Sequence, residues 1–253
     1  MPDLSVTAWA VLGVAAVFAG FAKTAIGGAG VVAAALAALV LPARGSSGTI
    51  LPLLIAGDFV AVAVYRRSAN WSLIARLMPW VLGGIALGVV FLDRVRGNRA
   101  LRVSIGVLIV VVLVAHAVVG AWLKQRLTTG TTRITPAQRL AAGLAGVGVG
   151  FATMVANSAG AIMTVYLLLS GVTMLEFLGT GAWFFLIVNL LKLPFSLRLG
   201  LMDAGSLRLD LALLPGLAIG CLIGVAVIRR LSPRHFERVA LGMAGVSAVF
   251  LLT

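Results

Sequence analysis

The chain has 253 residues, of which 61% are hydrophobic and 11% are charged. A soluble domain of this size has too little interior for so much apolar surface, and the apolar residues form runs near the length that spans a bilayer. In a soluble protein the net charge of +13 would suggest nucleic acid. Here the basic residues gather at the ends of apolar runs, where they face lipid headgroups. The sequence predicts an all-α polytopic membrane protein that lies in the lipid bilayer and binds no nucleic acid.

Ten apolar segments follow one another along the chain, and nearly all of them are close to spanning length. They cover residues 6–22, 26–42, 47–65, 73–92, 99–120, 138–155, 158–171, 176–194, 209–228 and 235–252. The longest polar connection is residues 124–136. It divides the chain into a first membrane repeat, 1–123, and a second, 137–253.

The two halves repeat each other in a consistent order. Residues 20–30 read GFAKTAIGGAG and residues 150–160 read GFATMVANSAG, at a separation of 130. A register of 131 sets Asp58 against Asn189. Further matches pair Gly48-Thr49 with Gly179-Thr180, Pro79 with Pro215, Gly84 with Gly220 and Gly88 with Gly224. The pattern predicts two inverted repeats of about five hydrophobic segments each, a transporter plan with its site near the midplane at Gly-rich hairpins.

In each half a Gly-rich hairpin joins two apolar segments with almost no loop. These hairpins either cross the membrane fully or turn back inside it. If the first segment crosses fully, Lys23 lies near the far interface and snorkels to water. If the hairpin turns back, Lys23 stands at its tip beside a helix N-terminus, which favours an anion.

The hairpins carry the candidate ligands of a small anionic substrate. The lysine supplies charge, the glycines let the backbone approach a ligand, and the hydroxyls and amide of the second hairpin offer neutral hydrogen bonds or serve as helix–helix contacts. The predicted substrate-binding residues are Lys23, Thr24, Gly27, Gly28, Thr153, Asn157 and Ser158.

Three further polar residues lie within apolar segments. Asp58 is about 16 Å into its segment at the rise of a helix, so it either pairs with a lysine or takes and releases a proton. Asn189 and Lys192 share one helix face. Lys192 precedes Pro194 and is interpreted as marking a helix end. All three are predicted to serve proton coupling or charge balance.

Several chemistries are missing from the sequence. One cysteine and two histidines argue against a metal site, and neither an HExxH pattern nor a P-loop is present. We therefore expect no catalytic residues, no metal and no cofactor. Two other interpretations stay open, namely a cation or metal-ion permease with Asp58 as ligand, and a non-transporting membrane enzyme or partner subunit.

Basic residues also bear on orientation. The positive-inside rule favours a cytoplasmic location for the connections that carry Arg66, Arg67, Arg229 and Arg230, which places both termini outside.

The paired hairpins, the Gly-Thr openings and the Pro/Gly-rich fourth segments resemble the TauE/SafE (sulfite exporter) family over nearly the whole chain. Members of that family are bacterial-type plasma-membrane permeases associated with export of small sulfur-containing or organic anions, such as sulfite and sulfonates. The resemblance implies a multi-pass secondary transporter of the plasma (inner) membrane that works by alternating access and is not an enzyme. A homodimer is compatible with this expectation.

Overall fold

The computed structural model describes residues 4–41, 47–95 and 136–233, and then residues 235, 236, 238–240 and 242. All of the regular elements in these ranges are helices. The predicted segment 99–120 lies outside the described residues, as do most of segment 235–252 and nearly all of the connection 124–136.

The helices follow the predicted segments closely. In the first half they are α1 (Val6–Thr24), η1 (Gly27–Ala29), α2 (Gly30–Val40), α4 (Leu51–Tyr65), η2 (Arg66–Ser68) and α5 (Trp71–Arg94). In the second half they are α7 (Pro136–Ala156), α8 (Gly160–Leu169), α9 (Met174–Arg198) and α10 (Ala204–Arg230). The start of α10 comes earlier than predicted, because Asp203 and Ser206 form a capping box ahead of the apolar run.

Four of these helices, α1, α5, α9 and α10, are long and apolar enough to cross a membrane. This finding confirms the prediction of an all-α membrane protein. In contrast, α2 has 11 residues and α8 has 10. At 1.5 Å per residue each is about 15–17 Å long, roughly half of a hydrocarbon core.

Glycine brings the long helices into close contact. Gly20 and Gly220 lie where α1 crosses α10, and a Cβ atom at either position would overlap main-chain atoms of the other helix. Gly84 and Gly150 play the same part where α5 crosses α7. Such small residues let backbones approach closely in lipid, where packing must replace the hydrophobic drive between helices.

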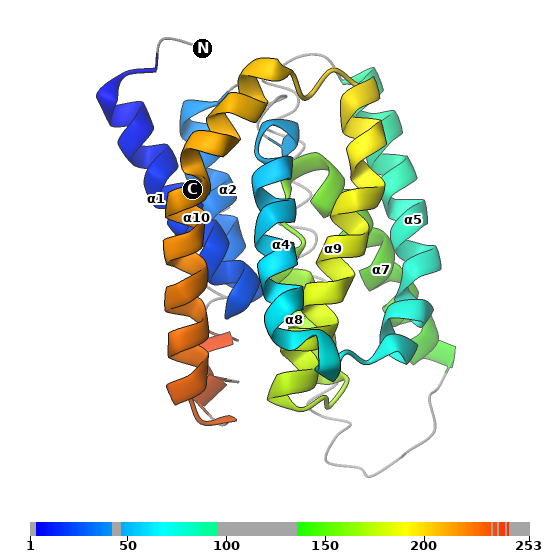
Figure 1. Cartoon of the computed structure of the whole chain (residues 1–253). Coiled ribbons are helices and arrows are strands. Elements are labelled where there is room, and N and C mark those ends of the chain that lie inside the picture. Colours follow the sequence, from blue (N-terminus) through cyan, green and yellow to red (C-terminus); the bar gives the residue numbers. More distant parts are fainter. Residues whose placement is uncertain are drawn as a thin grey trace.

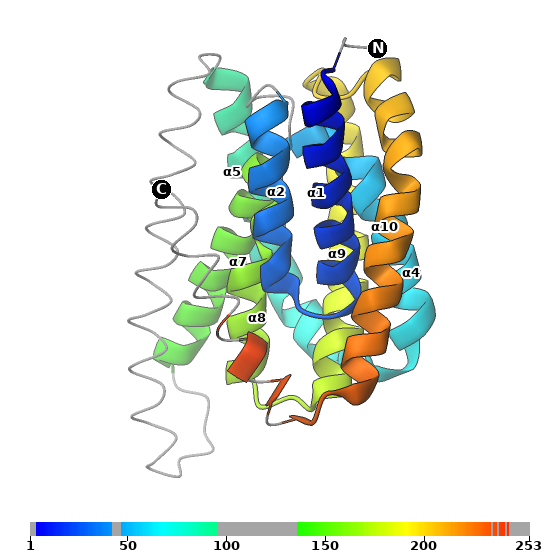
Figure 2. The same ribbon diagram turned by 90° about the vertical axis from the view of Figure 1, so that its left-hand side faces the viewer.

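Helices α4 and α9 pack side by side through the middle of the molecule, between α1 and α10 on one side and α5 and α7 on the other (Figure 1). The two run in opposite directions, α4 downward and α9 upward in that view. The turn that joins α1 to α2 lies well above the lower end of α10 (Figure 2). It meets the second hairpin there, because η1 packs against α8 and Gly27 lies against Gly160.

Candidate functional site

Lys23 occupies the last turn of α1, where its positive charge also complements the helix dipole. Its Nζ lies 2.6 Å from Oδ1 of Asp58 and 4.9 Å from the centre of the Phe185 ring. Only 12% of the Lys23 side chain is exposed. The sequence left open whether Lys23 snorkels to the interface or stands at the tip of a re-entrant hairpin, and the structure places its ammonium against Asp58 inside the protein.

Asp58 lies on α4 and is completely buried. Its second oxygen, Oδ2, accepts a hydrogen bond from Nδ2 of Asn189 on α9 at 2.6 Å. The packing of α4 on α9 therefore brings together the two residues that the sequence repeat sets against each other. Of the two roles predicted for Asp58, the pairing with a lysine is visible directly.

Lys192 lies inside α9, which continues through Pro194 to Arg198. The interpretation of Lys192 as a helix end is therefore wrong. A proline removes one backbone donor, but the packing of α9 on α4 holds the helix across that position. Lys192 is 1% exposed. The three-residue spacing from Asn189, which places both residues on one helix face, is the one sequence signal that agrees with this buried position.

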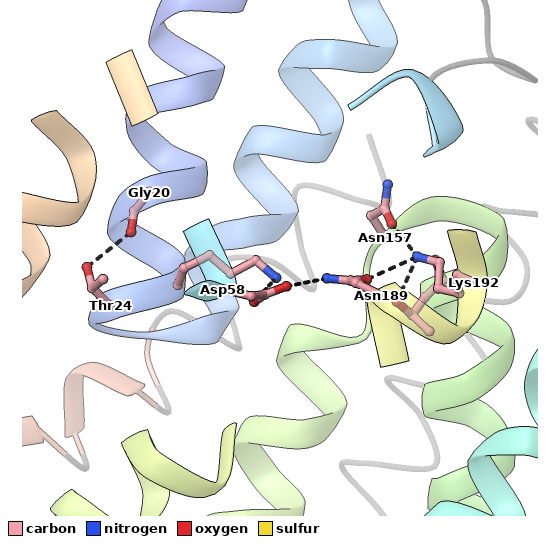
Figure 3. Close-up of polar contacts among 8 residues, drawn as sticks. Gly20, Thr24, Asp58, Asn157, Asn189 and Lys192 are labelled. Atoms are coloured by element: carbon pink, nitrogen blue, oxygen red, sulfur yellow. Dashed lines mark hydrogen bonds and ion pairs between the residues drawn. The ribbon is translucent and has the colours of Figure 1, made fainter. Parts of the chain in front are cut away.

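The Lys192 ammonium donates to oxygen atoms on two elements. It lies 2.6 Å from the carbonyl oxygen of Thr153 and 3.2 Å from the hydroxyl of the same residue. It lies 2.6 Å from Oδ1 of Asn157 and 3.4 Å from Oδ1 of Asn189. A single polar network therefore runs from Lys23 through Asp58, Asn189 and Lys192 to Asn157 (Figure 3).

Asn157 directly follows the last residue of α7 and sets the geometry of the second hairpin. Its φ is +51°, the left-handed region that asparagine adopts more easily than most residues. The chain turns there, and α8 begins at Gly160. The Asn157 side chain also donates from Nδ2 to the carbonyl oxygen of Ser47 at 2.7 Å, which ties the second hairpin to the first half.

A cavity of about 70 Å³ lies between the two hairpins and the central pair α4 and α9. Small apolar residues such as Ala22, Ala33 and Gly30 make up much of its wall. The polar side chains that line it are those of Lys23, Asp58, Thr153, Asn157, Thr164 and Asn189, and Gly27 also lines it. Most of the residues predicted from the two hairpins and the central helices therefore meet at one place.

Three predicted residues, Thr24, Ser158 and Lys192, are not among the described residues that line this cavity. The hydroxyl of Thr24 donates to the carbonyl oxygens of Gly20 and Cys221, at 3.1 and 3.0 Å, and Figure 3 places it away from Asp58. The hydroxyl of Ser158 lies 3.4 Å from the carbonyl oxygen of Ala152. Gly28 lies within η1. The two hydroxyls satisfy main-chain acceptors at the hairpin turns.

Thr164 on α8 is a cavity residue that the sequence analysis did not single out. It is 1% exposed, and its hydroxyl has no hydrogen-bond partner within the described part of the chain. Nothing in the local sequence distinguishes it from a threonine that packs between helices. Its role depends on the approach of α8 to η1, which only the tertiary structure provides.

The network contains two lysines and one carboxyl group. Asp58 pairs with Lys23 directly and is linked to Lys192 through Asn189. Within the described residues, no group of three or more histidine, cysteine, aspartate or glutamate side chains could hold a metal ion. The arrangement is one that an anion would complement.

The residues of this site all lie within a region of the chain that matches a known protein family. Residues 12–251 match the family model described as "Sulfite exporter TauE/SafE". Neither the curated proteins nor the solved structures that were compared gave a match.

Proposed function

Since the chain belongs to the sulfite exporter TauE/SafE family of membrane transporters, we propose that it is a secondary transporter of a small anion. As a family member it is a multi-pass membrane protein and not an enzyme. The proposed location is the plasma (inner) membrane. The proposed cargo is a small sulfur-containing or organic anion such as sulfite or a sulfonate, carried by export.

One observation carries the proposal, namely that two lysines and a single carboxyl group share the polar network beside the cavity. Isolated charge is costly within a membrane and is retained where a substrate or ion must be bound. Lys23 is neutralised by Asp58 at 2.6 Å, while Lys192 contacts only neutral oxygens. An anion in the adjoining cavity would balance that second charge. The small volume and the largely apolar wall suit a compact anion.

The proposed site comprises the residues that line the cavity together with the lysine behind them. Lys23 supplies charge, and Gly27 leaves room for a ligand close to the backbone. Thr153, Asn157 and Thr164 supply neutral hydrogen-bonding groups, and Asp58, Asn189 and Lys192 set the charge balance. Thr24, Gly28 and Ser158 support the hairpin turns next to the ligand.

We further propose that the halves are inverted repeats, as the sequence predicts. Reciprocal packing supports this: Gly20 lies against Leu217 and Cys221, while Gly150 lies against Val81 and Ile85. These contacts are equivalent under the register of the sequence repeat. The opposed directions of α4 and α9 agree with it (Figure 1).

Two half-length helices support re-entrant hairpins. Because α2 and α8 are each only about half a bilayer core in length, the hairpin tips would meet near the midplane. Broken helices that meet at mid-depth are how many transporters expose a site first to one side and then to the other. Alternating access around the 70 Å³ cavity is therefore the proposed mechanism.

The proposal is tested by flux in proteoliposomes. Purified protein is assayed with sulfite, sulfate, sulfoacetate, taurine and small carboxylates, with and without a pH gradient. We expect selective flux of a small anion, and its loss in Lys23→Ala and Asn157→Ala at normal expression. If both variants carry every tested anion at wild-type rates, the proposed site is wrong. Size measurement of the purified chain would test the predicted homodimer.

A further inference from the structure

Among the described residues, every hydrogen-bond partner of the Lys192 ammonium is a neutral oxygen. The partners are the main-chain carbonyl and the hydroxyl of Thr153 and the amide oxygens of Asn157 and Asn189, at 2.6 to 3.4 Å. Ion pairing within the described residues joins Lys23 to Asp58 and leaves Lys192 without a carboxylate. The lysine is nevertheless 1% exposed. The four oxygen atoms from Thr153, Asn157 and Asn189 that accept from this ammonium are called the oxygen cage below.

The cage lies at the end of a broken helix. The Thr153 carbonyl belongs to the last turn of α7, at the negative end of the helix dipole, and accepts from the main-chain N–H of Asn157 at 3.2 Å as well as from Lys192. Asn157 follows directly after the helix with a φ of +51°. Helix C-termini and unwound carbonyls at such breaks are the elements with which transporters coordinate a coupling cation. Carbonyl, hydroxyl and amide oxygens are also the ligands that hard cations take.

One amide connects the cage to the nearest negative charge. Asn189 donates from Nδ2 to Asp58 and presents Oδ1 to Lys192, at 2.6 and 3.4 Å. Its dipole is thus aligned between a carboxylate and an ammonium, an orientation that both charges favour. Figure 3 shows this alignment, with Asn157 approaching the same ammonium from above in that view.

We propose that Lys192 is a tethered cation, whose ammonium fills a site built for a small monovalent cation. The chain then needs no inorganic cation to hold the α7–α8 break, and transport does not depend on sodium. Removal of the ammonium by Lys192→Ala leaves an oxygen-lined vacancy that a free cation can enter. The sodium-independent flux rests on the proposed transport function, but the vacancy in Lys192→Ala does not.

The direct test is thermal unfolding of purified protein in detergent. Wild type, Lys192→Ala and Lys192→Met are compared in choline, sodium, ammonium and methylammonium chloride at one ionic strength. We expect the Tm of wild type to be the same in all four salts. In choline, the Tm of Lys192→Ala should be lower by about 5 °C or more. Sodium, ammonium or methylammonium should raise it in a saturable way.

Lys192→Met is the matched control, because its apolar side chain fills the same space without a charge. Its Tm should also fall, but no salt should raise it. The proposal is overturned if Lys192→Ala is as indifferent to the cation as wild type, or if sodium stabilises wild type. It is also overturned if Lys192→Ala cannot be recovered folded from cells and buffers that contain any of the three small cations.

A second measurement uses the unchanged protein. Anion flux in wild-type proteoliposomes should be equal in sodium and choline media, and a sodium-dependent flux would contradict the tethered cation. A protein that carries no tested anion would remove the transport proposal alone, because the thermal test of the oxygen cage stays valid.

Discussion

Substitutions at Lys23 and Asp58 should show whether this ion pair is needed for stability, for transport or for both. Breaking a buried ion pair by removing one partner costs about 3–5 kcal/mol, whereas replacing both by apolar residues costs much less. We therefore expect Lys23→Met and Asp58→Leu each to lower the Tm strongly. The double variant should recover much of that loss, yet carry no anion.

Thermal unfolding in detergent and proteoliposome flux measure the two effects. Single and double variants are compared at matched expression. A double variant whose loss in Tm equals the sum of the two single losses would show that the pair contributes nothing as a pair.

Thr164 offers a milder change at the cavity. Thr164→Val keeps the shape of a buried side chain and removes a hydroxyl that has no partner in the described part of the chain. If the hydroxyl binds the substrate, the KM should rise by about tenfold, the equivalent of one net hydrogen bond. The Tm should be unchanged or slightly higher. The exposed Ser170→Ala serves as control, and equal KM values for both variants would exclude Thr164 from the site.

At the scale of single elements, the break after α7 depends on both the backbone and the side chain of Asn157. Asn157→Gly keeps a residue that adopts positive φ easily, while Asn157→Ala does not. Both lose the hydrogen bonds to Lys192 and to the Ser47 carbonyl. We expect both variants to lose flux. Asn157→Ala should be less stable than Asn157→Gly by roughly 1 kcal/mol in the free energy of unfolding, and should therefore have the lower Tm. Equal Tm values would mean that the backbone at this turn carries no strain.

The crossing of α5 with α7 can be tested with two adjacent glycines. Gly84 lies against the main chain of Val147 and Phe151, so Gly84→Ala should force the helices apart and cost about 1–3 kcal/mol. Gly83 is exposed, and a Cβ atom added there would meet no other atom within 4 Å. Gly83→Ala should therefore be neutral or stabilising by up to about 1 kcal/mol. Thermal unfolding of both variants decides the point, and a Gly84→Ala protein as stable as wild type would contradict the close crossing.

For the whole molecule, the arrangement of connections predicts sidedness. The α4–α5 and α8–α9 connections lie at one end and the α9–α10 connection at the other (Figure 1). Arg66, Arg67, Arg229 and Arg230 belong to the first end, which the positive-inside rule makes cytoplasmic. In a Cys221→Ala background, Ser68→Cys and Ser170→Cys should react with an impermeant maleimide only in inside-out vesicles.

Ala204→Cys, at the start of α10, is the matched control for the opposite end of the molecule. It should react in intact cells and not from the cytoplasmic side. Labelling of all three cysteines from one side would contradict the arrangement of the connections, and a full reversal would overturn the orientation alone.

The sequence by itself determined the membrane character and most helix positions, because lipid demands long apolar runs and a helix satisfies its own backbone. It also singled out Lys23, Asp58, Asn157 and Asn189, because polar residues stand out where apolar ones are expected. Because these residues lie on different segments, the sequence pattern did not predict which of them are in contact.

Only the tertiary structure decided the partners. Asp58 and Asn189 meet because α4 packs on α9, and Lys192 turns inward because α9 continues past Pro194. The hydroxyl of Thr24 turns to a main-chain carbonyl of α10, and Thr164 enters the cavity wall. These outcomes depend on contacts between segments far apart in the chain, which local pattern and propensity do not encode.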